Sequence, residues 1–417
     1  MTILLKSATI IDNSSPFHLQ KMDLLIENGI IKKIASTIKN ENSVKEINLE
    51  NLHISQGWFD TSVCFGEPGF EERETIENGL LTAAKSGFTA VAINPNTFPV
   101  ADNKSAIEFI KNKANKTATE VFPIGNLTKG AEGKDLAELF DMQNSGAIAF
   151  GDYNKSITNA NFLKISLQYT QNFDGIVISF PQDNSIAGKG LVNEGKNSTK
   201  LGLKAIPYLA EEMQIARDLF ILEYTGGKLH IPTVSTSKGV NLIKKAKKKG
   251  LNVTCSVSAH HLVLNDEELA NFDSNTKVLP PLRTKKDVKA LIKGVNEGII
   301  DMITSDHNPI DIEHKKVEYE NSKFGTIGLE SLYGSLNNVV NTEALINCLT
   351  IKPRERFNLP TNNINEGEKA NISLFNPDFE FEFSEENIYS TSKNSIFLNK
   401  KMNGKVYGII ANNKAVL

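Results

Sequence analysis

The sequence is poor in cysteine, with Cys64, Cys255 and Cys348 far apart in a chain of 417 residues. Their spacing matches neither a disulfide framework nor a zinc ribbon, and it favours a reducing compartment. No apolar run approaches the roughly 20 residues that cross a bilayer, and the N-terminus lacks a basic region followed by a long apolar core. These absences argue against a membrane or secreted protein, so we expect a cytoplasmic one.

The chain also lacks a marked excess of charge of either sign. Its formal net charge is -3, which offers no concentrated basic surface for nucleic acid or an acidic membrane. The lysines at 244–249 are interpreted as the solvated end of a helix, where cations suit the helix dipole. The composition, 40% hydrophobic and 23% charged, is typical of a globular protein with a sizeable core. We therefore expect neither a nucleic-acid nor a membrane partner.

Short apolar runs and amphipathic segments alternate through the middle of the chain. The stretch 57–100 reads as strand, polar loop, helix and strand, with the helix at 72–85. The alternation yields close to eight parallel strands, which favours an α/β fold with a closed (β/α)8 TIM-like barrel over an open sheet. Further strands are predicted at 120–124, 147–151, 175–179, 228–231, 252–257 and 300–304, and helices at 105–116, 135–145, 206–224, 237–249 and 285–297.

Both ends of the chain are rich in short β-type runs. Turn signals at Asn28-Gly29 and Asn412-Asn413 separate some of them, because Asn and Gly tolerate the positive φ of a tight turn. Two β-rich ends around an alternating middle predict one small β-sandwich domain built from both termini. We place it at residues 1–51 plus 366–417, and the barrel at 52–365.

A motif on the first predicted barrel strand carries a family resemblance. The segment DTSVCFGEPG (residues 60–69) resembles the motif Asp-x-His-x-His-x-Arg-Glu-Pro-Gly of the long-type dihydroorotases, which are cyclic amidohydrolases, and the resemblance covers nearly the whole chain. It implies a barrel that hydrolyses a ring amide with bound metal. However, Ser62 and Cys64 stand in place of the two metal-binding histidines. Gly66 replaces the arginine that grips the substrate carboxylate.

The later strands show the same pattern, in which the residues around each ligand position match the family motif but the ligand itself is replaced. The family's strand-five and strand-six motifs place Phe180 and Thr233 at the positions of two further metal-binding histidines. The acidic positions remain: Asp152 fits the strand-four carboxylate ligand, and Asp306 fits the strand-eight aspartate, the family's catalytic base. All four histidine ligands are therefore absent, and the two aspartates are left as a vestigial metal set. Phenylalanine cannot ligate metal, and hydroxyls are weak neutral donors.

Other residues match family motifs outside the metal set. The resemblance assigns Asn96 and Arg283 to substrate binding. Asp60 is interpreted as structural, bonding backbone near the strand end. Cys64 would serve as a nucleophile only if a base, His307 or His261, lay within reach, since a lone thiol on an apolar strand is usually inert.

Two hypotheses follow for the function. In the first, the chain is a dihydroorotase homologue of pyrimidine biosynthesis that lacks catalytic metal and serves as a structural or regulatory partner of aspartate transcarbamoylase. In the second, it is an active dihydroorotase or other cyclic amidohydrolase, working through an atypical zinc site or through Cys64. The missing ligands favour the first, for which we expect no cofactor. The resemblance also implies a homodimer.

Overall fold

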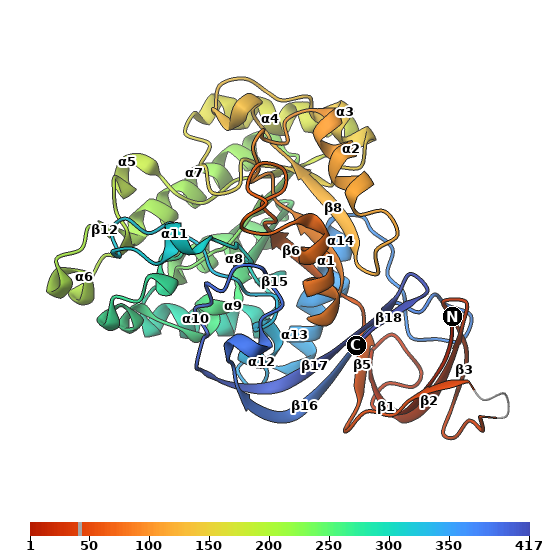
Figure 1. Cartoon of the computed structure of the whole chain (residues 1–417). Helices are drawn as coiled ribbons and strands as arrows, with labels where there is room; N and C mark the ends of the chain where they lie inside the picture. The colour runs from red at the N-terminus through yellow and green to blue at the C-terminus, as the bar shows by residue number, and fades with distance from the viewer. Residues whose placement is uncertain (41–43) are drawn as a thin grey trace.

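The computed structural model describes residues 1–40 and 44–417, and its centre is an eight-stranded parallel barrel (Figure 1). The strands follow one another in chain order around the barrel, and a parallel bridge between Val63 and His307 joins the first strand to the end of the last. This confirms the predicted α/β barrel. Its strands are β6 (Trp58–Val63), β7 (Phe88–Ile93), β8 (Glu120–Gly125), β9 (Ala149–Phe150), β10 (Ile176–Ile178), β13 (Lys228–Ile231), β14 (Val253–Ser258) and β15 (Met302–Thr304).

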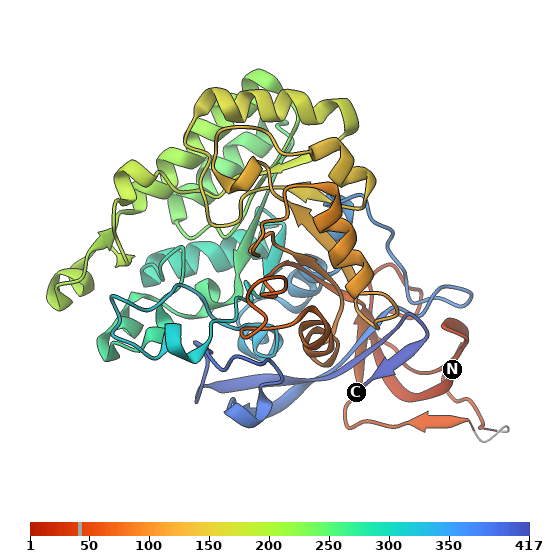
Figure 2. The same cartoon turned by 45° about the horizontal axis from the view of Figure 1, so that its top comes forward.

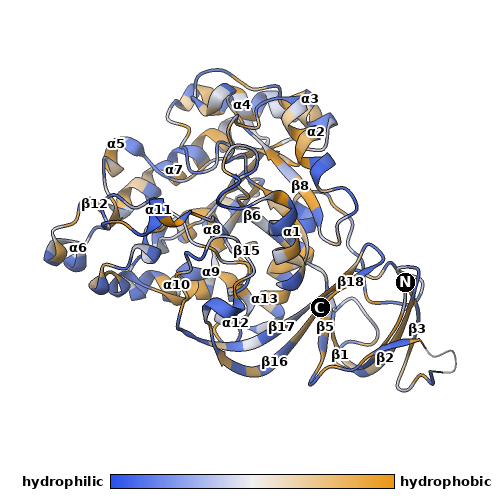
Figure 3. Ribbon diagram, viewed as in Figure 1, coloured by the Kyte–Doolittle hydropathy of each residue, from blue (hydrophilic) through white to orange (hydrophobic). Residues whose placement is uncertain are grey.

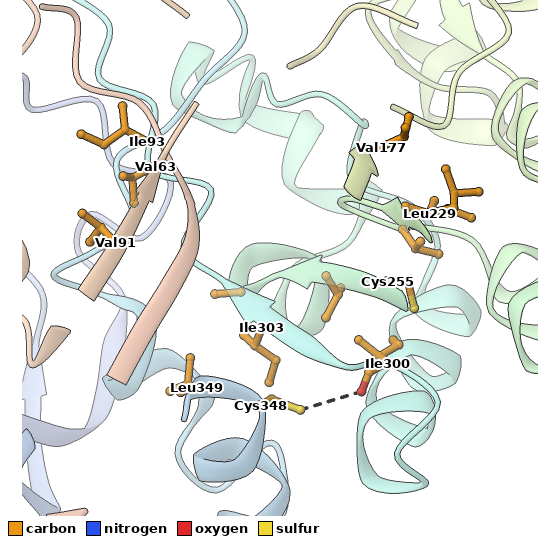
Figure 4. Close-up of a cluster of buried hydrophobic side chains, with 14 of the residues drawn as sticks. Val63, Val91, Ile93, Val177, Leu229, Cys255, Ile300, Ile303, Cys348 and Leu349 are labelled. Carbon is orange, nitrogen blue, oxygen red and sulfur yellow. Dashed lines mark hydrogen bonds between the residues drawn. The ribbon is translucent and has the colours of Figure 1, made fainter. Parts of the chain in front are cut away.

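Helices surround the barrel, and orange and blue residues alternate along them in Figure 3, as amphipathic helices require. Their apolar faces cover the strands, and Figure 4 shows Val63, Ile303 and Leu349 in this core. The main helices are α1 (Ile76–Lys85), α2 (Lys104–Lys113), α3 (Leu139–Asn144), α4 (Ala160–Thr170), α7 (Tyr208–Thr225), α8 (Ser237–Lys248), α10 (Lys285–Asn296), α13 (Thr342–Leu349) and α14 (Ile351–Arg356). Short helices α5 (Asn184–Ala187) and α6 (Lys196–Leu201) extend outward from the barrel (Figure 2).

Local signals explain where the helices begin and end. Helix α1 starts at Ile76, later than predicted, because the Thr75 side chain accepts a hydrogen bond from the backbone N–H of Asn78. Helix α4 was missed, although Asn159 caps it in the same way and its apolar residues recur at helical spacing. Strand β9 is shorter than predicted, with two residues. Within the described residues, no helix is both long and apolar enough to cross a membrane.

Strands from both ends of the chain form a second sheet, at the side of the molecule where both termini lie (Figure 1). Its order is β18-β17-β16-β5-β1-β2-β3, with β4 paired to β1. The two ends of the chain meet where β5 pairs antiparallel with β16. The strands are β1 (Thr2–Ile11), β2 (Lys21–Glu27), β3 (Ile30–Ala35), β4 (Lys45–Ile47), β5 (His53–Gln56), β16 (Ile372–Glu382), β17 (Lys401–Ala411) and β18 (Lys414–Val416). The exact domain bounds given above stay a prediction.

A buried aromatic cluster joins the terminal sheet to the barrel. Trp58 begins β6 and contacts Phe88, Tyr333 and Phe375, with ring centroids 5.8, 5.1 and 5.5 Å away. Ser373 on β16 accepts a hydrogen bond from the Trp58 backbone N–H at 2.9 Å and donates one from its hydroxyl to the carbonyl of Gly87 at 2.6 Å. One hydroxyl therefore satisfies two buried backbone groups of the barrel.

Ser373→Ala is expected to lower the free energy of unfolding by about 1 to 3 kcal/mol, because it leaves a buried N–H and a buried carbonyl without partners. Urea unfolding followed by Trp58 fluorescence measures this loss. The matched control is Ser14→Ala on the exposed surface, which should change stability by less than about 0.5 kcal/mol. Equal effects of the two substitutions would contradict the proposed role of Ser373.

Candidate functional site

The carboxyl ends of the barrel strands surround a small cavity, the position where barrel enzymes place their active sites. Thr61, Ser62, Tyr153, Thr233 and Asp306 are among its lining residues, so β6, β9, β13 and β15 all contribute to it. The cavity leaves only ≈ 20 Å³ for the centres of water-sized molecules. Sites for small organic ligands usually measure about 300 to 1,000 Å³, whereas a single water needs about 10 to 15 Å³. The cavity has room for water but not for a ring substrate.

A hydrogen-bonded chain crosses the cavity from β7 to β15. The Asn94 side-chain amide donates to the Ser62 hydroxyl at 3.0 Å, and that hydroxyl donates to Asp306 at 3.4 Å. Asp60 lies beneath and accepts hydrogen bonds from the backbone N–H groups of Ser62 and Ser305 at 3.0 and 2.9 Å. The structural role predicted for Asp60 is thereby confirmed.

Asp306 is buried without a cation beside it. Burial and, to a smaller extent, the negative charge of Asp60 raise its pKa to about 8, against the opposing effect of the Ser62 hydroxyl. Burial also raises the pKa of Asp60 to about 6, against the hydrogen bonds from Ser305 and Ser62. At neutral pH Asp306 is therefore mostly protonated as long as no cation lies beside it.

Cys64 lies beside this chain but is not activated. Burial raises the pKa of its thiol to about 12, although Tyr153, Asn96 and Asn94 lie within hydrogen-bonding reach and favour the thiolate. Of the two proposed bases, His307 accepts a hydrogen bond at Nδ1 from the Gly328 backbone, and its pKa falls to about 3 on burial. His261 is hydrogen-bonded to Ser258 and to the Pro280 carbonyl. This geometry does not support the nucleophile hypothesis for Cys64.

Asp152, the expected carboxylate ligand, does not line the cavity. It accepts four hydrogen bonds at 2.6 to 3.1 Å, from the Asn126 side chain, the backbone N–H groups of Leu127 and Thr128, and the Thr128 hydroxyl. Both oxygens are thus occupied in fixing the loop after β8. The residue that enters the cavity from β9 is its neighbour, Tyr153. The sequence analysis did not identify Tyr153 as a cavity residue. The one signal for it was its position next to Asp152, the expected ligand.

The two later ligand positions differ in their surroundings. The Thr233 hydroxyl lines the cavity, is buried, and has no hydrogen-bond partner among the described residues. Phe180 is buried after β10 and does not line the cavity. His230, which does line it, binds Thr254 and Ser256 through its two ring nitrogens at 3.0 and 3.2 Å. Its pKa falls to about 3 through burial, so the ring is neutral and already occupied.

Three residues of the cavity have left-handed backbone conformations. Tyr153, Thr233 and Asp306 have φ values of +53°, +47° and +50°. Such values are uncommon for side-chain-bearing residues and least favourable for a β-branched residue such as Thr233. Backbone strain of this kind concentrates at functional sites. The barrel thus retains the backbone of a site that aims side chains inward from three different strands.

The substrate-binding residues suggested by the resemblance lie outside the cavity lining. Arg283 is buried and donates to the Ser235 hydroxyl, to the Asn193 side chain and to the Ile206 carbonyl, at 2.9 to 3.1 Å. These contacts hold the guanidinium within the protein, and its assignment to substrate binding stays a prediction. Asn96 is half-buried near the Cys64 thiol. No side chain fits at Gly66, because a Cβ there would lie 2.0 Å from the carbonyl oxygen of Phe70.

These residues do not fit the zinc site that the resemblance implies. A catalytic zinc ion needs about three protein ligands from thiolate, imidazole or carboxylate, with water in the remaining position. Here Asp152 is fully hydrogen-bonded, Cys64 does not line the cavity, and the side chains around Asp306 are mainly hydroxyls. Over the described ranges 1–40 and 44–417, no group of three or more His, Cys, Asp or Glu side chains is arranged to hold a metal ion.

Comparison with known proteins establishes the family. A dihydroorotase from Caldicellulosiruptor saccharolyticus is 40% identical over 99% of this chain and 97% of its own length. This chain belongs to the dihydroorotase family. The family model described as Dihydro-orotase-like matches residues 53–239, and a dihydroorotase from Syntrophus aciditrophicus is 38% identical over 97% of both chains. Membership of the family confirms the resemblance seen in the sequence.

Solved structures agree with the fold at lower sequence identity. The L-hydantoinase (dihydropyrimidinase) of Arthrobacter aurescens superposes with a TM-score of 0.84 at 20% identity, covering 100% of this chain and 98% of its own. A dihydropyrimidinase from Brevibacillus agri gives the same TM-score at 18% identity, over 100% of this chain and 95% of its own. At such identities the likeness concerns the fold alone, a barrel with an additional sheet.

Proposed function

We propose that this chain is a non-catalytic member of the dihydroorotase family, which acts in pyrimidine biosynthesis as a structural or regulatory partner of aspartate transcarbamoylase. The observation that carries the proposal is the small volume of the cavity at the barrel mouth. Its volume of ≈ 20 Å³ opposes a ring substrate, and its lining, in which Asp306 is the single carboxyl group among hydroxyls and Tyr153, opposes a catalytic metal. The names of the relatives, which are dihydroorotases, support the assignment to pyrimidine biosynthesis.

The metal content of the purified chain is the first test. We expect well under one equivalent of zinc per chain, because Asp306 is the single acidic side chain among the residues that line the cavity. Elemental analysis after growth with added zinc measures it, and Cys64→Ser should leave the content unchanged. Stoichiometric zinc that disappears in Cys64→Ser and in Asp306→Ala would overturn the proposal.

An assay of dihydroorotate hydrolysis tests the second hypothesis, an active hydrolase with an atypical site. Wild-type chain and Asp306→Ala should show the same residual rate, which would then come from host enzyme. A rate that falls at least tenfold in Asp306→Ala would assign the activity to this chain. That outcome would favour the active hydrolase, whose cavity would have to open by movement of Tyr153.

The partnership is tested with the aspartate transcarbamoylase of the same organism. The two chains, mixed at about 10 μM each, should co-elute from a gel-filtration column if their Kd is about 1 μM or below. The partner's activity or thermal stability should change on binding. Separate elution with unchanged partner activity would remove this part of the proposal while leaving the non-catalytic part intact.

A further inference from the structure

A segment without regular structure follows the last barrel strand. Beyond β15 the chain forms the short helix α11 (Ile312–Lys315), labelled in Figure 1, and residues 316–325 then contain neither helix nor strand. The backbone carbonyls of such a segment find no partners in a helix or a sheet, and a buried carbonyl needs a donor from elsewhere. The donors that this loop uses therefore identify what holds it in place.

The first donor is Lys277, which lies between β14 and α10 and is only 2% exposed. Its Nζ donates to the backbone carbonyls of Tyr319, Glu320 and Ser322 at 2.8, 3.0 and 2.6 Å. The same amino group lies 5.6 and 5.1 Å from the ring centroids of Tyr319 and Phe324, which is close enough for cation–π attraction. The loop is thus wrapped around one amino group from another part of the chain.

The second donor is Lys315, the last residue of α11, which is 4% exposed. Its Nζ donates to the carbonyls of Lys323 and Gly325 at 3.0 and 2.7 Å, and to the Lys277 carbonyl at 3.3 Å. The Gly325 backbone N–H donates to the same Lys277 carbonyl at 3.0 Å. The two lysines therefore form one connected set of hydrogen bonds between the loop and the segment around Lys277.

Enclosing two amino groups in this way is costly. Burial lowers the pKa of both lysines, and together with the charge of neighbouring Lys277 it lowers that of Lys315 to about 7. Hydrogen bonds within the protein must then replace the water that these groups lose. Five of the six acceptors are carbonyls of residues 316–325. The cost is therefore offset only while this loop keeps its present conformation.

The loop forms part of a cleft that is much larger than the cavity in the barrel. This cleft measures ≈ 930 Å³, and residues 273–275 and 310–316 are among those that line it. The loop is also joined to the barrel, because the backbone N–H of Asn308 donates to the Thr326 carbonyl at 2.8 Å. Fixing residues 316–325 therefore fixes one wall of the cleft and the chain that directly follows Asp306.

We propose that Lys277 and Lys315 act together as an internal clamp, which holds residues 316–325 closed against the segment between β14 and α10. The clamp gives the cleft a fixed shape before any ligand arrives. Without either amino group the loop opens, because its inward carbonyls lose their donors. This inference is independent of the proposed non-catalytic role, since neither lysine lines the small cavity of the barrel.

Two backbone amides of the loop report on its opening. The N–H of Lys323 donates to the His314 carbonyl and that of Gly325 to the Lys277 carbonyl, each at 3.0 Å. Hydrogen-bonded amides exchange with deuterium when the structure around them opens. Hydrogen–deuterium exchange of the full chain, measured by mass spectrometry on peptides that cover residues 316–325, therefore follows the clamp directly.

Lys277→Met and Lys315→Met keep an apolar stem but remove the donors. In each variant, residues 316–325 should exchange at least about tenfold faster than in the wild type, because three hydrogen bonds to buried carbonyls are lost. Exchange in the barrel strands should stay unchanged, which separates opening of the loop from loss of the whole fold. Lys316→Met, at the exposed next residue, is the matched control and should leave exchange in the loop unchanged.

Chemical rescue distinguishes a missing hydrogen-bond donor from lost packing. Lys277→Ala removes the three methylenes and the amino group that n-propylammonium carries, so added n-propylammonium should restore slow exchange in residues 316–325. Tetramethylammonium has the same charge but no N–H to donate, and it should not restore it. The rescue gives an answer even if the methionine variants fold poorly, because it is measured as a recovery within one variant.

Three results would overturn the clamp. The first is wild-type exchange of the loop in both methionine variants. The second is faster exchange spread evenly over the barrel and the loop, which would make the two lysines general contributors to stability. The third is equal rescue of Lys277→Ala by tetramethylammonium and n-propylammonium, which would show that charge alone, without hydrogen bonds to the carbonyls, holds the loop.

Discussion

Asp306→Asn is expected to stabilise the chain by about 3 to 5 kcal/mol at pH 9. The pKa of this carboxyl is about 8 in the folded chain, against 3.8 as its ordinary value. The folded state thus holds the proton more tightly than the unfolded state. The stability linked to this proton is complete below about pH 4 and is lost as the pH rises through 8. Asparagine resembles the protonated form at every pH and also tolerates the left-handed backbone at this position.

Urea unfolding of both proteins from pH 5 to pH 9 measures the effect. The stability difference should grow across this range and level off above the folded pKa. Asp152→Asn is the matched control, and we expect it to destabilise, because the Asp152 carboxylate accepts four hydrogen bonds and the amide nitrogen of asparagine accepts none. An Asp306→Asn protein that is less stable than wild type at pH 9 would show that Asp306 is ionised and has a partner.

A rebuilt zinc site is the second large effect, and it should depend on Tyr153. The variant Ser62→His, Cys64→His, Phe180→His and Thr233→His supplies four imidazoles, but Tyr153 still occupies the cavity from β9. Adding Tyr153→Asp removes the phenol and brings in a carboxylate, which the left-handed backbone accepts. We expect the fivefold variant to bind at least one zinc per chain and the fourfold variant far less.

Thermal unfolding with and without zinc separates the two variants. At zinc concentrations a thousandfold above the Kd, binding stabilises the fivefold variant by about 4 kcal/mol. Adding Asp306→Asn should remove most of that gain, because a coordinating carboxylate is lost. Equal zinc binding by the fourfold and fivefold variants would show that Tyr153 does not obstruct the site.

The barrel could be predicted from the sequence because each strand motif is recognisable from the residues that surround it. The residues around Ser62, Thr233 and Asp306 match the family motifs, although the residues at the ligand positions 62 and 233 do not. Turn residues and strand lengths could be recognised as well. The absence of the four histidines could also be recognised from the motif residues that flank each ligand position. Both inferences depend on local patterns, and local patterns determine where a strand ends and which residue follows it.

The direction of side chains could not be predicted from the sequence. Asp152 and Tyr153 are adjacent, yet Tyr153, whose backbone is left-handed, lines the cavity and Asp152 does not. The buried guanidinium of Arg283 is held by hydrogen bonds to Asn193 and Ile206, which lie about 80 to 90 residues earlier in the chain. The volume of the cavity likewise results from residues of several strands together. These properties arise from tertiary packing, which no single motif encodes.

The loop that begins at Gly66 limits what a single substitution at this position can do. Any side chain at this position would place its Cβ 2.0 Å from the Phe70 carbonyl oxygen, in a loop held by the hydrogen bond from the Phe70 backbone N–H to the Gly66 carbonyl. An arginine introduced at position 66 would therefore collide with the backbone of this loop, which would have to move before the side chain could reach the cavity. Under the proposed non-catalytic role, a return to substrate binding would thus need a change of backbone as well as a change of side chain.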